Sequence, residues 1–206
     1  MKYIWLSVFT AVLLWSGIEP KDTFTWFLEV LPALIGLVLI ALTYNTFRLT
    51  PLLYGLILLH CIVLMVGGHY TYAEVPLFDN LFGAQRNNYD KVGHFFQGFV
   101  PAILAREILI RKQIVNGQFW VSAVAVSMCL AFSAFYELIE WWVALATGEN
   151  AEAFLGTQGY VWDTQSDMAF ALVGALCATL MLSRWHNSQL VSLHQTIEPQ
   201  QRNESW

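Results

Sequence analysis

The sequence predicts an all-α protein, a polytopic membrane helical bundle of about six transmembrane helices with both termini in the cytoplasm. Three observations predict this fold class: the composition, the length of the apolar runs and the distribution of basic residues. Hydrophobic residues make up 57% of the chain and charged residues 12%, whereas a soluble domain has about 25% charged residues. A chain this apolar has too few polar residues to cover its surface in water. We therefore expect the lipid bilayer to surround it.

Six apolar runs are candidates for membrane spans, since a helix needs about 20 mostly apolar residues to cross a bilayer. The first run follows Lys2 and has no small-x-small cleavage site after it, so we expect an uncleaved span rather than a signal peptide. Polar connectors at 19–23, 45–50, 71–90, 110–118 and 147–162 separate the runs. The expected spans are 3–18, 25–44, 51–70, 91–110, 119–146 and 163–183.

These spans form one transmembrane domain at residues 1–185. Residues 186–206 form a polar cytoplasmic tail, for which the composition predicts disorder. The chain has no internal repeat. Because inverted repeats are common in secondary transporters, this weakens the interpretation of the protein as a transporter built on inverted halves. The sequence contains no indication of an oligomeric state.

Basic residues near the ends of the spans predict the orientation, because they concentrate on the cytoplasmic side. With the N-terminus inside, seven lie on the inner side and three on the outer side: Lys2, Arg48, Arg106, Arg111, Lys112, Arg184 and Arg202 against Lys21, Arg86 and Lys91. The net charge of −5 and the scattered basic residues also exclude nucleic acid as an expected partner, which would require a clustered basic face.

Polar residues from four segments meet at the outer side in this topology. The start of span four supplies Asp90 and His94, and the fifth and sixth spans supply the other carboxylates: Glu137, Glu140, Asp163 and Asp167. The end of span three has His69, and whether it closes the cluster is left open. Asp90 and His94 are four residues apart, as are Asp163 and Asp167, so each pair shares one helix face. We expect these side chains to share one outward-facing polar pocket.

Depth in the membrane indicates that these groups have partners. Asp167 precedes Arg184 by 17 residues, a rise of about 25 Å against a hydrocarbon core of about 30 Å. An ionisable side chain at this depth costs on the order of 2–3 kcal/mol, and such groups usually face the bundle and pair.

Three roles for the pocket remain open. It could be a structural cluster in which Arg86 and Lys91 neutralise the carboxylates. It could hold a divalent metal ion through His94 and carboxylates, which suit a hard or borderline cation. It could also be a cationic site for a lipid phosphate headgroup. The candidates are His94, Glu137 and Asp167 for catalysis, Arg86, Lys91 and Gln97 for ligand binding, and His94, Glu137, Asp163 and Asp167 for metal.

Other polar residues have simpler interpretations. Glu29 lies near the outer end of span two, where the expected behaviour is snorkelling to the interface. We interpret Arg106 and Glu107 as an interfacial anchor at the inner end of span four. His186 lies in the polar tail and is expected to be solvated, and His60 is expected to pack within its span.

The run from Tyr89 to Phe95, Glu137, and the run from Asp163 to Met168 resemble the YjdF-like family of bacterial inner-membrane proteins. This resemblance implies an inner-membrane location and a multi-pass topology, and it implies no reaction.

The order of Asp-Lys-x-x-His-Phe, an embedded Glu and a later Asp is distantly similar to VanZ-like membrane proteins. That pattern has Asn four positions and Gly seven positions after the Asp. Here Ala171 stands at the Asn position, and Gly174 matches. The distant similarity implies a role at the cell envelope, on lipid-linked or cell-wall material.

The leading functional hypothesis is an envelope protein that binds or acts on an anionic, lipid-linked ligand. Arg86 and Lys91 would meet its phosphate, while the histidine and carboxylates would hold a cation or transfer protons. A proton- or ion-coupled transporter is an alternative, although the inner halves of spans four to six are mostly apolar. A structural scaffold without catalytic role is a third hypothesis.

Overall fold

The computed structural model describes residues 2–72, 74–76, 78, 87–147 and 161–203. Within these residues the chain forms six helices and no strand, which confirms the predicted all-α membrane bundle. The helices are α1 (Lys2–Ser16), α2 (Thr23–Thr43), α3 (Pro51–His69), α4 (Tyr89–Arg111), α5 (Gln118–Thr147) and α7 (Asp163–Asn203). The first five begin and end within two residues of the expected spans.

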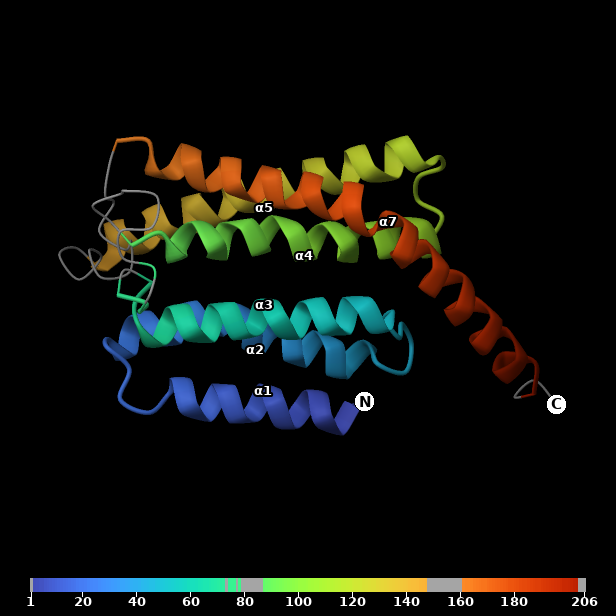
Figure 1. Ribbon diagram of the computed structural model, residues 1–206, viewed down its shortest axis with the longest axis horizontal. Coiled ribbons are helices and arrows are strands. Elements are labelled where there is room, and N and C mark those ends of the chain that lie inside the picture. The colour runs from blue at the N-terminus through green and yellow to red at the C-terminus, as the bar shows by residue number, and fades with distance from the viewer. Residues whose placement is uncertain (1, 73, 77, 79–86, 148–160, 204–206) are drawn as a thin grey trace.

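The helices run side by side in alternating directions (Figure 1). One end of the bundle contains the N-terminus and the α2–α3 and α4–α5 connections, and we call it the N-terminal end. The opposite end contains the α1–α2 connection and the starts of α4 and α7. The sequence predicts that the N-terminal end faces the cytoplasm.

Local sequence signals account for the starts of two helices. Asp22 caps α2 by accepting a hydrogen bond from the Thr25 backbone N–H at 2.7 Å. Thr50 caps α3, and Pro51 occupies its first position, where the missing N–H of proline costs nothing.

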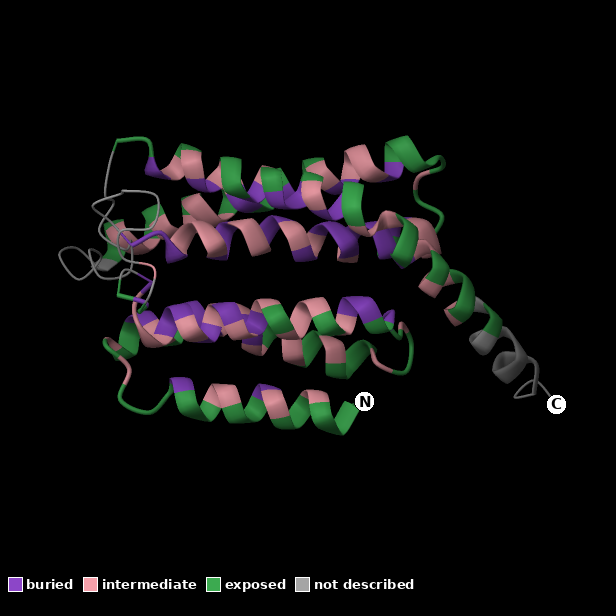
Figure 2. Cartoon of the chain, in the orientation of Figure 1, coloured by how far each residue is buried: buried purple, intermediate pink, exposed green. Residues whose placement is uncertain are grey.

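Four helices are long and apolar enough to cross a membrane by length and composition: α2, α3, α5 and α7. The shorter α1 has 15 residues and is exposed along much of its length (Figure 2). α4 differs because it is rich in polar residues. It contacts α3, α5 and α7, and its polar residues His94, Gln97, Arg106 and Glu107 are buried. Neighbouring helices rather than lipid therefore surround these polar side chains.

α4 makes its most extensive contact with α7, and small residues form that contact. A Cβ atom added to Gly98 would overlap the backbone carbonyl of Ala171. A Cβ atom added to Gly174 would likewise overlap the backbone carbonyl of Phe95. Close approach of two backbones through small residues is a common way for helices to associate in membranes. Ala171, Ala175 and Ala178 are fully buried along the same side of α7.

The prediction of a disordered tail at residues 186–206 is wrong for its first part, which is helical. α7 continues to Asn203 and changes direction towards its C-terminal end (Figure 1). His186 is fully buried rather than solvated, and Gln189 Oε1 accepts a hydrogen bond from the Leu52 backbone N–H at 2.8 Å. These contacts with α3 and α4 give residues 186–189 tertiary partners that composition does not reveal.

Replacing Gly98 with alanine is expected to destabilise the bundle, because the added methyl group overlaps the α7 backbone. Overpacking of this kind costs about 1–3 kcal/mol or more. Thermal unfolding of detergent-purified protein, followed by circular dichroism, measures the effect.

Gly55→Ala is the matched control, since an added Cβ at Gly55 meets no atom within 4 Å. It is expected to leave the unfolding temperature unchanged or slightly raised. Equal unfolding temperatures for Gly98→Ala and Gly55→Ala would contradict the close α4–α7 contact.

Candidate functional site

Four helices bring ionisable side chains together at the end of the bundle opposite the N-terminus. α4 contributes Asp90 and His94, α5 contributes Glu137 and Glu140, α7 contributes Asp163 and Asp167, and α2 contributes Glu29. We call these seven residues the polar cluster. Glu29 is close enough to Asp90 and His94 to interact electrostatically with both. Glu140 is likewise close enough to interact with Glu137 and His94.

His94 is the centre of the polar cluster, with carboxylates near both ring nitrogens. Its Nε2 lies 3.4 Å from Asp90 Oδ1 and 3.9 Å from Asp167 Oδ2. Its Nδ1 lies 3.1 Å from Gln97 Oε1 and 4.0 Å from Glu137 Oε1. The side chains of His94, Glu137 and Asp167 are 7%, 8% and 6% exposed, whereas that of Asp90 is 24% exposed. Asp90 is thus the member of this group most accessible from outside.

Asp90, His94 and Asp167 lie close enough together that they could hold a metal ion. One ligand atom from each residue lies within 4.8 Å of the others. Ligands placed tetrahedrally at 2.0–2.1 Å from a zinc ion are about 3.4 Å apart, close to the 3.4 Å between His94 Nε2 and Asp90 Oδ1. The oxygen of Asp167 lies farther from His94 Nε2, at 3.9 Å.

Gln97 fixes the orientation of the imidazole. If Nδ1–H donates to Gln97 Oε1, at 3.1 Å, the lone pair on Nε2 faces Asp90 and Asp167. Metal-binding histidines commonly donate their second ring N–H in this way. Gln97 was a candidate for ligand binding, and in the structure its described contact is with His94 instead.

Two buried carboxylate oxygens have no hydrogen-bond partner among the described residues: Glu137 Oε1 and Asp167 Oδ1. Burying a polar oxygen without a partner is costly, more so when it is charged. The polar cluster can therefore accept a cation or protons at these two positions.

Of the other predicted site residues, Asp163 belongs to the polar cluster, Lys91 lies at its edge and Arg86 falls outside the described part of the chain. Lys91 donates from Nζ to Asn88 Oδ1 at 3.2 Å and lies 5.9 Å from the centre of the Phe170 ring. Asp163 is buried one turn before Asp167, and the neighbouring Thr164 hydrogen bonds with Glu137. Arg86 lies outside the described residues.

His69 does not join the polar cluster. Its Nδ1 lies 3.0 Å from the backbone oxygen of Ser16, and its ring packs 4.7 Å from that of Trp15. The histidine therefore connects the end of α3 to α1.

Sequence reasoning missed three members of this region. Glu29, expected to snorkel, is buried and hydrogen bonds with Tyr72. Burial raises the pKa of Tyr72 well above its ordinary value, so its hydroxyl group remains protonated and can donate. Tyr136 packs with its ring 6.4 Å from that of His94. The position of Glu29 within the apolar run of α2, several residues after the helix begins at Thr23, was the available sign that it is buried. The same kind of argument, from depth in the membrane, applied to Asp167.

A second polar network lies near the N-terminal end of the bundle. Glu107 is fully buried and accepts hydrogen bonds from Thr50 Oγ1 at 2.8 Å, the Thr50 backbone N–H at 3.1 Å and Arg111 at 2.9 Å. His186 Nε2 lies 3.1 Å from Glu107 Oε2. α3, α4 and α7 are therefore joined at one carboxylate.

Arg106 extends this network on the other side of α4. Its guanidinium donates to Gln118 Oε1 at 2.8 Å and Asn187 Oδ1 at 2.6 Å. Both Arg106 and Glu107 are fully buried, so the interpretation as an interfacial anchor is wrong. Their partners come from α3, α5 and α7. Because most of these partners are distant in the sequence, the residues next to Arg106 and Glu107 give no sign of them.

Comparison with known proteins gives a family match over most of the chain. The family model described as "Predicted membrane protein (DUF2238)" matches residues 1–188. The chain is 53% identical over 184 residues to "Inner membrane protein YjdF" of Escherichia coli (strain K12), covering 88% of each chain. No solved structure matches. The resemblance to the YjdF-like family is confirmed, and the distant similarity to VanZ-like proteins stays a prediction.

Glu107→Ala is expected to lower the free energy of unfolding by about 3–5 kcal/mol, because it leaves several buried partners of the carboxylate unsatisfied. Thermal unfolding in detergent measures the change. Glu74→Ala is the control, since Glu74 is 57% exposed and paired with Lys21 at 2.9 Å, and exposed pairs contribute about 0–1 kcal/mol. Equal losses in the two variants would contradict a buried network.

Proposed function

Since the chain belongs to the DUF2238 family and is a multi-pass inner-membrane protein, we propose that its polar cluster binds a divalent metal ion at which the protein engages an anionic envelope ligand. The observation that carries this proposal is the close approach of ligand atoms from Asp90, His94 and Asp167, within 4.8 Å of one another. Two of these residues come from α4 and the third from α7, so the proposed site depends on the packing of the two helices.

The energetics of buried charge support a cation in the polar cluster. His94 is the basic side chain within ion-pair distance of Glu137 and Asp167 among the described residues. A single imidazolium ion is a small counter-charge for several carboxylates. A divalent ion bound to Nε2 would neutralise more charge, and would give the unpartnered Asp167 Oδ1 a ligand role.

The ligand types restrict the choice of metal. One imidazole nitrogen with carboxylate oxygens suits a borderline or hard cation such as Zn²⁺ or Mn²⁺, while a site for a soft cation would use thiolates. Three protein ligands leave at least one coordination position open. A phosphate oxygen of an anionic ligand, or a water molecule, would occupy that position.

Glu137 has a different role in this arrangement. It lies 4.0 Å from Nδ1 of His94, on the side of the ring away from Asp90 and Asp167. We propose that it stabilises the imidazole and accepts protons near the site, and does not bind the metal directly. Lys91, at the edge of the polar cluster, would contribute positive charge towards the anionic ligand.

A transporter is less well supported by the same geometry. The polar cluster and the Glu107 network both involve α4, but about 13 Å of helix separates Gln97 from Arg106. The buried residues between them include Val100, Ala102 and Ile103, which pack with Ala175 and Ala178 in an apolar core. These apolar side chains lie between the two polar regions along α4, where a transporter would need polar groups.

The metal proposal is tested by loading detergent-purified protein with Zn²⁺ or Mn²⁺ and measuring bound metal by inductively coupled plasma mass spectrometry. Wild type is expected to bind about one ion per chain, by the single-site geometry. His94→Gln and Asp167→Asn are expected to lose at least roughly 100-fold in affinity, and Gln97→Leu about 10–100-fold, since it supports the histidine indirectly.

His69→Gln is the matched control, a histidine at the same end of the bundle whose described partner is the Ser16 backbone. It is expected to bind metal as wild type does. Wild-type protein that binds neither ion, or a His94→Gln variant that binds as tightly as His69→Gln, would refute the proposal. Circular dichroism of each variant establishes that it remains folded.

A further inference from the structure

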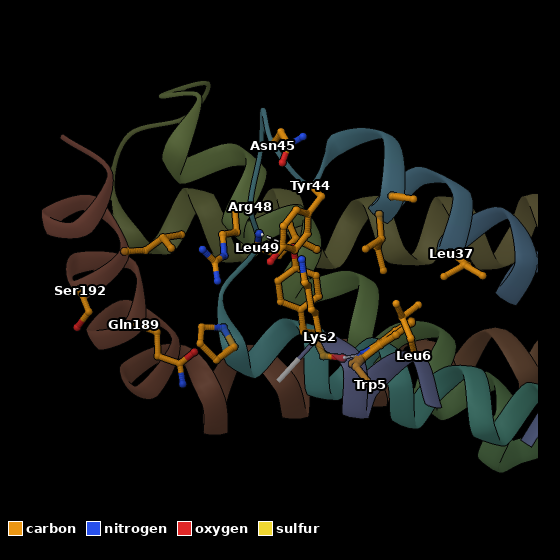
Figure 3. Close-up of a pocket in the computed structure, with 15 residues that line it drawn as sticks. Lys2, Trp5, Leu6, Leu37, Tyr44, Asn45, Arg48, Leu49, Gln189 and Ser192 are labelled. Atoms are coloured by element: carbon orange, nitrogen blue, oxygen red, sulfur yellow. Dashed lines mark hydrogen bonds between the residues drawn. The ribbon is translucent and has the colours of Figure 1, made fainter. Parts of the chain in front are cut away.

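A cavity of about 540 Å³ opens near the N-terminal end of the bundle (Figure 3). The polar cluster lies at the opposite end, where α4 and α7 start. Its walls come from α1, α2, α3 and α7 and from the connection between α2 and α3. The apolar part of the lining includes Trp5, Leu6, Leu37, Ile40 and Ala41. The volume falls within the range of about 300–1,000 Å³ typical of ligand sites.

Hydrogen bonds hold the aromatic wall of the cavity in place. Trp5 Nε1 donates to the backbone oxygen of Tyr54 at 2.8 Å. The hydroxyl group of Tyr54 in turn accepts from the Leu49 backbone N–H at 3.3 Å. The indole N–H of Trp5 is thus occupied, and the Tyr54 hydroxyl group is held in place as an acceptor. Both residues line the cavity.

Two cations lie near the same aromatic ring at the cavity. Lys2 Nζ lies 5.9 Å and Arg48 Cζ lies 5.5 Å from the centre of the Tyr44 ring, and all three residues line the cavity. Figure 3 shows the side chains of Lys2 and Arg48 near the ring of Tyr44. Neither cation has a carboxylate partner among the described residues. Two basic groups without a carboxylate counter-ion attract an anion.

Gln189 adds a hydrogen-bond donor at the same place. It lines the cavity, and its Oε1 is held by the Leu52 backbone N–H at 2.8 Å. This hydrogen bond orients the side chain and leaves the amide NH₂ group able to donate to a ligand.

We propose that this cavity binds an anionic phospholipid, with its phosphate between Lys2 and Arg48 and one acyl chain against the apolar wall. The combination of a charged rim and a mostly apolar interior fits an amphiphile. The polar groups of a soluble ligand would find no hydrogen-bond partners along the apolar interior walls. The proposal is independent of the metal site, because the two share no residue and lie at opposite ends of the bundle.

The test uses full-length protein in detergent and counts bound lipid by native mass spectrometry. Phosphatidylglycerol and phosphatidylcholine with the same acyl chains are the probes. Wild type is expected to prefer phosphatidylglycerol by roughly tenfold or more, since two basic residues favour the anionic headgroup. The double variant Lys2→Gln, Arg48→Gln is expected to lose this preference. Ala41→Trp, which fills the cavity, is expected to lose binding of both lipids.

Lys112→Gln is the control for charge. Lys112 lies at the same end of the bundle, 5.7 Å from the Phe47 ring centre, and does not line the cavity. It is expected to bind phosphatidylglycerol as wild type does. Equal binding of the two lipids by wild type, or an unchanged preference in the double variant, would overturn the proposal.

Two other occupants would also overturn it. Inorganic phosphate that displaces phosphatidylglycerol from wild type, and still binds to Ala41→Trp, would indicate a site for a soluble anion. A dimer mass that disappears in Ala41→Trp would indicate that a second copy of the chain fills the cavity.

Discussion

The close contact between α4 and α7 is the constraint on which both polar regions depend. Gly98 and Gly174 lack the Cβ atoms that would overlap the opposite backbone. The two helices can therefore approach until their main-chain atoms are in contact. At one end this contact places Asp167 3.9 Å from His94. At the other end the same two helices place His186 3.1 Å from Glu107. One helix pair therefore assembles two buried groups of ionisable residues.

A membrane protein can bury so many polar groups only if other helices surround them. α4 is less apolar than α2, α3 and α5, and its residues His94, Gln97, Arg106 and Glu107 are buried. An apolar layer that includes Val100, Ile103 and Ala178 lies between the two groups. Lipid accordingly contacts mainly the outer helices, which are apolar enough to face it. The arrangement accounts for both the apolar composition and the buried charges.

The sequence was sufficient for the fold and for part of the polar cluster. Apolar run length located five helices, and the four-residue spacing of Asp90 and His94 placed both on one face. It was insufficient for Glu29, Glu107 and His186, which look like ordinary residues near span ends. Glu107 and His186 are 79 residues apart, and only tertiary packing brings them together. Composition likewise predicted disorder after residue 185, where contacts with α3 and α4 extend the helix.

Pulsed electron paramagnetic resonance of the Mn²⁺-loaded protein tests the central claim most directly, because it detects nitrogen nuclei bound to the metal. The account predicts coupling to one imidazole nitrogen, which disappears in His94→Gln and persists in His186→Gln. A wild-type spectrum without nitrogen coupling, or a coupling that survives in His94→Gln, would contradict a metal site built by the α4–α7 contact.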